Sequence, residues 1–170
     1  YLMLELVGKR LVTEKVELRI GYDHEGVPHD YDGEYEMDRY NRKIPKSVHG
    51  SMLLERQTAS AKLAIQAMLQ IFDRIVNPLL WIRRINVVAI DVIPESQAAE
   101  KPIQYGLFDD IEALEAKRQQ QDEKLKKEYA LQKTMLSIKS RYGKNAILKC
   151  MNFQKHSTAI ERNGQVGGHK

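Results

Sequence analysis

Apolar and polar residues alternate strictly from residue 15 to residue 22. Val16, Leu18 and Ile20 would point to one side of a β-strand, while Glu17 and Arg19 would point to the other. A strand with a single apolar face belongs in a sheet that is covered on one side and open to solvent or a ligand on the other. The pattern therefore predicts a one-sided sheet.

The other periodic segments predict the layer that covers this sheet. Residues 46–55 and 81–93 also alternate, whereas 2–13 and the stripe from Ala64 to Ile75 have helical spacing. Thr58 and Ser60 are candidate N-caps for the second helix. Residues 23–45 show no period and predict a long loop or an irregular hairpin. The order helix, strand, strand, helix, strand predicts an α+β, two-layer sandwich, with a mostly antiparallel sheet and two helices on one face.

Four parts follow from these patterns. We expect a folded domain over 1–95, a linker over 96–108, a highly charged helix over 109–140 and a flexible basic tail over 141–170. The first residues have the pattern of a helix interior, with no signal peptide, so we expect the N-terminus to be a cut. No apolar run approaches membrane-spanning length, and the single cysteine, Cys150, predicts a cytoplasmic setting without disulfides.

The charge of the chain is unevenly distributed. Residues 23–38 hold seven acids and no base, while residues 139–170 hold seven bases and one acid, within a net charge of +4. A basic surface interrupted by one acidic loop suits a protein that binds a polyanion, but it is equally common on proteins that do not.

The open face of the predicted sheet is the first candidate site. Small hydroxyl groups, amides and guanidinium groups on a flat sheet can follow a phosphate backbone without reading bases, although an ordinary solvated face has the same pattern. The candidate DNA-binding residues are Arg19, Arg42, Lys43, Lys46, Ser47, His49, Ser51, Arg83, Arg84 and Asn86.

A short peptide after the proline-containing linker is the second candidate site. Leu107 and Phe108 could fill an apolar pocket of a partner while the amide of Gln104 bonds to its rim, or they could fold back onto their own domain. Spacing alone ranks the two possibilities equally.

Catalytic and metal-binding patterns are weak in this sequence. The five histidines lack ligand spacing with one another or with Cys150, and the acids of 23–38 lie on a loop rather than a rigid scaffold. We therefore expect no metal or cofactor site and no catalytic centre within this chain.

Three motifs together resemble one family. The segments Arg42-Lys-Ile-Pro-Lys-Ser-Val-His-Gly-Ser-Met, Phe72-Asp-Arg-Ile and Ile82-Arg-Arg-Ile-Asn-Val-Val are similar to the little-finger domain of Y-family (UmuC/DinB-type) lesion-bypass DNA polymerases. Gln104-Tyr-Gly-Leu-Phe-Asp-Asp resembles the clamp-binding peptide of that family. The segments 141–149 and 161–170 are similar to the C-terminal end of a UmuC-like branch.

The resemblance implies a function in DNA repair. The open sheet face would hold the backbone of a primer-template, with Arg84 as the phosphate-contacting arginine and Arg83 beside it. Gln104, Leu107 and Phe108 would dock on the bacterial sliding clamp. Catalysis and its Mg²⁺ would belong to a palm domain outside this chain, so this fragment would not be an enzyme by itself.

The chain departs from the family in three places. The family has a further strand before the first helix, so we expect the sheet here to expose an edge. Tyr105 stands where leucine is usual, and the acidic loop is longer than typical.

An alternative function for the chain is a protein-interaction module. Such a module would recruit repair partners through the charged helix and the tail, and its sheet face would be inert.

Overall fold

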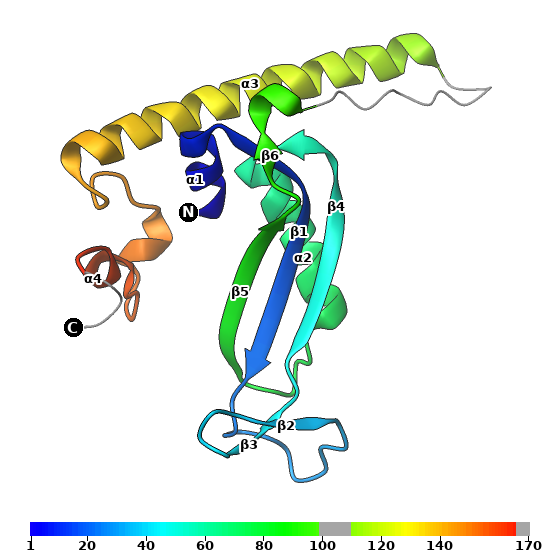
Figure 1. The fold of residues 1–170 in the computed structure, drawn as a ribbon, viewed down its shortest axis with the longest axis vertical. Helices are drawn as coiled ribbons and strands as arrows, with labels where there is room; N and C mark the ends of the chain where they lie inside the picture. Colours follow the sequence, from blue (N-terminus) through cyan, green and yellow to red (C-terminus); the bar gives the residue numbers. More distant parts are fainter. Residues whose placement is uncertain (99–109, 166–170) are drawn as a thin grey trace. The chain divides into compact units, whose positions relative to one another are not determined.

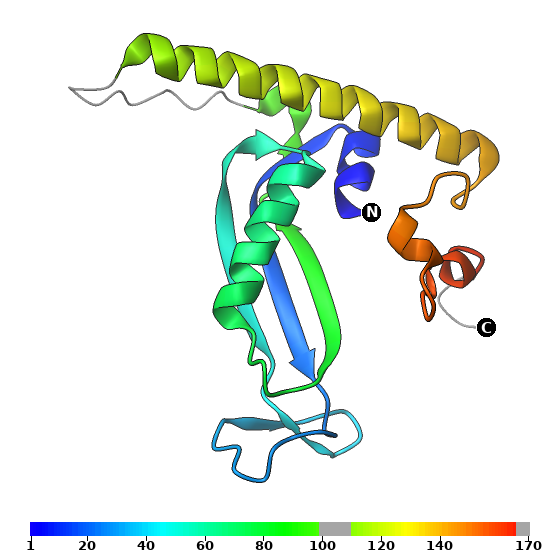
Figure 2. The same cartoon turned by 180° about the vertical axis from the view of Figure 1, so that it is seen from behind.

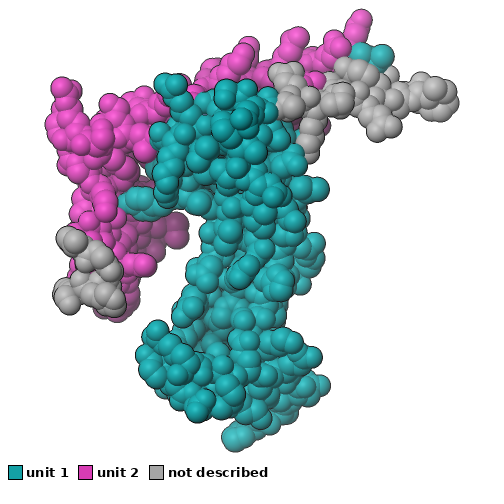
Figure 3. Space-filling view, in the orientation of Figure 1, with its two compact units in different colours: residues 1–111 teal, residues 112–170 magenta. Residues whose placement is uncertain are grey.

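The computed structural model describes residues 1–98 and 110–165. The chain divides into two compact units, residues 1–111 and 112–170, which are coloured separately in Figure 3. The Leu107 and Phe108 peptide lies outside the described residues. The two units are described separately below.

The first unit is built on an antiparallel sheet with β1 (Leu11–Tyr22) at its centre. The strands β4 (Val48–Thr58) and β5 (Ile82–Ile90) flank β1, and the short β6 (Ile93–Pro94) pairs with its first residues (Figure 1). A one-turn 3-10 helix, Glu95–Gln97, follows β6. The mixed α+β architecture with a mostly antiparallel sheet confirms the predicted fold class.

Helices α1 (Leu2–Lys9) and α2 (Ala61–Ile75) supply the covering layer. Helix α2 lies behind the sheet in Figure 1 and in front of it in Figure 2. The side chains of β1 that the alternation predicted to be apolar and inward are buried, and they meet apolar residues of both helices. The core includes Met3, Leu6, Val7, Val16, Leu18, Ile20, Tyr22, Ala64, Ala67 and Ile71.

Two local features fix α2 against the sheet. Ser60 is its N-cap, as predicted, and its hydroxyl accepts a hydrogen bond from the Leu63 amide at 3.2 Å. Gly50 of β4 lies under the helix, and a Cβ there would come within 2.9 Å of Ile71 Cγ2. The absence of a side chain at Gly50 therefore permits the close approach of helix and strand.

The predicted helix over 2–13 is wrong beyond Lys9. Arg10 adopts a left-handed conformation with φ of 54°, which ends α1, and Leu11 already pairs with Pro94 in the sheet. Helical spacing continued by chance into residues that form the first part of β1. The β-branched Val12 and Thr13 favour the strand.

The segment predicted as a loop or irregular hairpin contains a small second sheet. Strands β2 (Tyr35–Met37) and β3 (Lys43–Pro45) pair antiparallel, with Glu36 opposite Ile44. In both cartoon views this hairpin lies at the end of the main sheet where β1 ends. We call residues 35–45 the hairpin.

Strand β5 is an edge strand among the described residues. Ile85 and Val87 face the helix side of the sheet, yet they are 51% and 46% exposed. The sheet therefore has an open apolar edge among the described residues.

The second unit consists mainly of the long charged helix α3 (Ile111–Tyr142), which confirms the predicted charged helix, although it begins and ends two residues later than predicted. A 3-10 turn (Cys150–Phe153) and the short helix α4 (Ala159–Asn163) follow it. Among the described residues, no helix combines the length and apolarity needed to cross a bilayer.

Candidate nucleic-acid interface

Polar side chains form a row across three strands on the face opposite α1 and α2, which we call the outer face. Arg19 of β1 lies directly opposite His49 of β4 on one side and Asn86 of β5 on the other. All three side chains are exposed. Residues that pair directly across antiparallel strands point to the same face, so this row follows from the register.

The neighbouring rows show where the polar part of the outer face ends. The next row toward the hairpin brings Gly21 opposite Arg84, and the row on the other side brings Glu17 opposite Ser51 and Val88. One row further, Lys15 pairs with Leu53 and Ile90. The polar half of the outer face is therefore the half nearest the hairpin.

A β-bulge adds Arg83 to this half. The ladder pairs Gly21 with Arg84 but Tyr22 with Ile82, so Arg83 is an extra residue in β5 without a partner in β1. Arg83 and Arg84 both line the pocket beside Arg19. Strict alternation would have directed Arg83 to the helix side, whereas the bulge directs it to the same side as Arg84.

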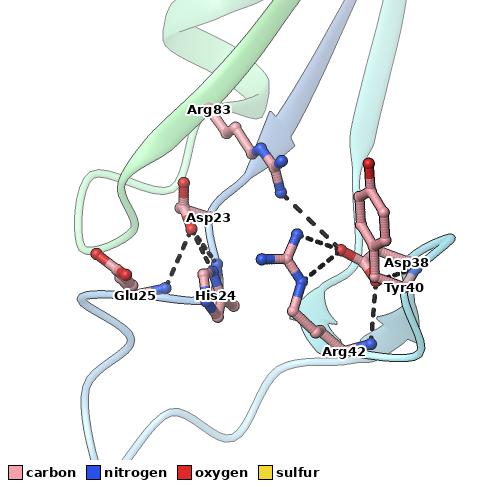
Figure 4. A network of polar contacts seen from close by, with 7 residues as sticks. All are labelled: Asp23, His24, Glu25, Asp38, Tyr40, Arg42 and Arg83. Atoms are coloured by element: carbon pink, nitrogen blue, oxygen red, sulfur yellow. Dashed lines mark hydrogen bonds and ion pairs between the residues drawn. The ribbon is translucent and has the colours of Figure 1, made fainter.

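Asp38 organises the hairpin (Figure 4). One carboxylate oxygen accepts hydrogen bonds from the amides of Tyr40 at 2.8 Å and Arg42 at 3.0 Å, and the other accepts from Nε and Nη2 of Arg42 at 2.9 and 2.7 Å. Arg83 Nη1 approaches the second oxygen at 4.0 Å. The carboxylate therefore closes the turn and lies near a strand of the main sheet.

These donors shift the acidity of Asp38. The Arg42 amide, the Arg42 guanidinium and the Tyr40 amide all stabilise the carboxylate and lower its pKa to about 2, while desolvation opposes them. Asp38 accordingly stays ionised well below neutral pH.

Three of the predicted basic residues lie in the hairpin or directly after it rather than in the row across the sheet. Arg42 is held by Asp38, Lys43 Nζ lies 4.1 Å from the ring centroid of Tyr35, and Lys46 pairs with Glu34. Ser47 donates its hydroxyl and its amide to Glu36 at 2.9 and 3.1 Å. Two carboxylates of the acidic segment, Glu34 and Asp38, therefore neutralise Lys46 and Arg42 and reduce the capacity of these two bases to bind phosphate.

A pocket of about 460 Å³ lies between the hairpin and the outer face. Four arginines and two carboxylates line it, together with an exposed tyrosine and polar groups of the row. The residues that carry these groups are Arg19, Arg39, Arg83, Arg84, Glu36, Asp38, Tyr40, Ser47 and Asn86.

Sequence reasoning missed Asp38, Arg39 and Tyr40 as site residues. Arg39 and Arg42 place their guanidinium carbons 4.8 and 5.2 Å from the centroid of the Tyr40 ring. The signal was present, because the aromatic Tyr40 stands between the bases Arg39 and Arg42. It was obscured by the acidic composition of the preceding residues.

The remaining predictions concern residues or groups away from this pocket. Gln104, Leu107 and Phe108 fall outside the described residues. Within residues 1–98 and 110–165, no cluster of three or more His, Cys, Asp or Glu side chains is arranged to hold a metal ion. Cys150 is exposed.

Comparison with known proteins yields no match, whether the chain is compared with family models, with curated sequences or with solved structures.

Proposed function

We propose that this chain binds the backbone of duplex DNA through the polar half of the outer face, as the little-finger fragment of a lesion-bypass DNA polymerase. The single observation that carries the proposal is the row of Arg19, His49 and Asn86, flanked by the bulged pair Arg83 and Arg84 on a face that neither α1 nor α2 covers. The guanidinium, imidazole and amide groups of these residues can donate hydrogen bonds to successive phosphates.

The charge balance of this face favours sequence-independent contact. Arg19 is paired with Glu17, whereas Arg84 has no ion pair among residues 1–98 and 110–165. The short side chains of Ser51 and Asn86 suit backbone contact better than insertion into a groove to reach base edges. Binding of this kind weakens steeply as salt concentration rises.

The parent protein and its recruitment are part of the same proposal. A template-primer held by this face would serve a polymerase palm with its own Mg²⁺, in translesion synthesis during DNA repair and the SOS response. The peptide containing Gln104, Leu107 and Phe108 would dock the parent on the sliding clamp, in the bacterial cytoplasm. Replacing Leu107 and Phe108 by alanine is expected to abolish clamp pull-down without changing DNA affinity, and unchanged pull-down would contradict the docking proposal.

Charge reversal tests DNA binding directly. Arg83→Glu combined with Arg84→Glu is expected to lower the affinity for a duplex at least tenfold, measured by fluorescence anisotropy, because two phosphate contacts become repulsive. Lys62→Glu combined with Lys9→Glu is the control with the same change in net charge, because both are exposed bases on the helices that cover the other side of the sheet. Equal affinities for the double variant and the wild type would contradict the proposal.

One observation favours a second function, protein recruitment through the second unit. Helix α3 exposes Leu131 at 61%, and the turn after it exposes Met151 and Phe153 at 70% and 68%. Exposed large apolar side chains on a charged helix are typical of partner-binding surfaces. If the Arg83 and Arg84 reversal leaves DNA affinity unchanged, recruitment of a repair partner without direct DNA contact becomes the better explanation.

A further inference from the structure

We propose that the pocket between the hairpin and the outer face binds an unpaired nucleotide at the end of the DNA duplex. This inference rests on the proposed function and adds to it a preference for one kind of DNA structure. The module would bind a duplex with a single-stranded overhang more tightly than a blunt duplex of equal length.

The position of the hairpin supplies the first argument. The pocket is lined by Arg19, Arg84 and Asn86 of the outer face and by Asp38 and Tyr40 of the hairpin. The hairpin lies at the end of the main sheet (Figure 1), so a duplex that lies along the outer face toward this end would reach the hairpin. A single strand is narrower and more flexible than a duplex, so we expect it to continue into the pocket where the duplex ends.

The chemistry of the lining supplies the second argument. Both carboxylates of the pocket are already hydrogen-bonded, Asp38 to Arg42 and Glu36 to Ser47. Arg84 has no ion pair within the described part of the chain, and Arg83 reaches Asp38 only at 4.0 Å. These two guanidinium groups are therefore available for a phosphate, for which they are well suited.

Tyr40 supplies the third argument. Its side chain is 61% exposed although two arginines approach its ring at 4.8 and 5.2 Å. An exposed aromatic ring beside guanidinium groups is a stacking platform for a base, and stacking tolerates any sequence. The pocket volume of about 460 Å³ lies in the range of small-molecule sites.

In this arrangement three sets of groups would each bind a different part of the nucleotide. Arg83 and Arg84, which contact the last phosphates of the duplex, would also hold the phosphate that links the duplex to the unpaired nucleotide. Asn86 would lie near the sugar, and the Tyr40 and Arg39 side chains would stack on the base. The ionised Asp38 holds the hairpin through its hydrogen bonds within the turn. The phosphate-binding and base-stacking side chains therefore remain available to the nucleotide.

The test compares two DNA probes with two variants of the full chain. A blunt duplex and the same duplex with a five-nucleotide overhang are titrated by fluorescence anisotropy at one salt concentration. Tyr40→Ala removes the stacking ring, while Tyr40→Phe keeps it. Both variants keep the two amide hydrogen bonds to Asp38, because these involve the backbone.

We expect the wild type and Tyr40→Phe to prefer the overhang by roughly 5-fold or more, the range given by one stacked base. Tyr40→Ala is expected to lose this preference while its affinity for the blunt duplex stays within about twofold. Equal affinity of the wild type for both probes would overturn this inference and leave the proposed function intact. A failure to bind either probe would overturn both.

Discussion

Arg83 and Arg84 are consecutive in β5, yet both side chains line the same pocket. The bulge between the pairs Gly21–Arg84 and Tyr22–Ile82 produces this arrangement. Two adjacent residues therefore place their guanidinium groups on the same face of the sheet. In a regular strand, adjacent side chains point to opposite faces.

The bulge predicts that both arginines contribute to DNA binding. Arg83→Ala and Arg84→Ala should each weaken duplex binding and reduce the salt slope of log Kd by about one, because each removes one phosphate contact. Affinity measured at four or more salt concentrations gives this slope. If only Arg84→Ala has an effect, Arg83 points away from the DNA and the bulge has no role in binding.

The contacts of Asp38 predict how the hairpin responds to acid. The folded pKa of about 2 lies below the ordinary value for aspartate of about 3.9. Asp38 therefore stabilises the fold fully above its ordinary pKa, and this contribution is lost as the pH falls through about 2. Carboxyl ¹³C chemical shifts should report a titration midpoint for Asp38 well below the ordinary aspartate value. A midpoint near 4 would contradict the described contacts.

Hydrogen exchange gives a second measure of the same turn. Asp38→Asn should speed the exchange of the Arg42 and Tyr40 amides at neutral pH, because a neutral acceptor holds them less strongly than a carboxylate. The amides of β1 should be unaffected and serve as the internal control.

Two glycines provide a matched pair for packing. Gly50→Ala should lower the free energy of unfolding by about 1–3 kcal/mol, because its Cβ would meet Ile71 Cγ2 at 2.9 Å and Ile75 Cγ2 at 3.1 Å. Gly21→Ala should be tolerated, because its Cβ would meet only Arg84 Cβ at an ordinary 3.7 Å. Urea denaturation of both variants measures the difference, and equal stability would show that α2 does not pack closely on β4.

The open edge of β5 predicts a solubility effect. Ile85→Lys should reduce self-association without a large loss of stability, because Ile85 is half exposed and a charge on an edge strand opposes strand pairing. Ile20→Lys is the contrasting variant, since Ile20 pairs with Ile85 but is fully buried, and it should unfold the domain. Light scattering and thermal denaturation of both variants measure these effects. Unchanged self-association of Ile85→Lys would show that this edge does not mediate it.

The sequence predicted the faces of the strands better than their ends. Alternation placed Arg19, His49 and Asn86 on one side because side chains in a strand have a period of two. It could not place them in one row, since register depends on turns and bulges that no periodic pattern records. The end of α1 was missed because Arg10 adopts a left-handed conformation that arginine rarely takes.

The sequence could not decide between a long loop and an irregular hairpin for 23–45, for a different reason. Its order depends on pairings between distant residues, such as Lys46 with Glu34 and Ser47 with Glu36, rather than on any local period. The acidic composition of 23–38 did not indicate this order, but in the structure several of its carboxylates, among them Asp38, stabilise the turn and its neighbours.

Chemical-shift mapping tests the central claim most directly. Titration of the ¹⁵N-labelled chain with a short duplex should perturb the amides of Arg19, His49 and Asn86, and should leave those of Ile65 and Leu69 on α2 unchanged. Perturbations confined to α2 or to the second unit, with an unaffected outer face, would contradict the account.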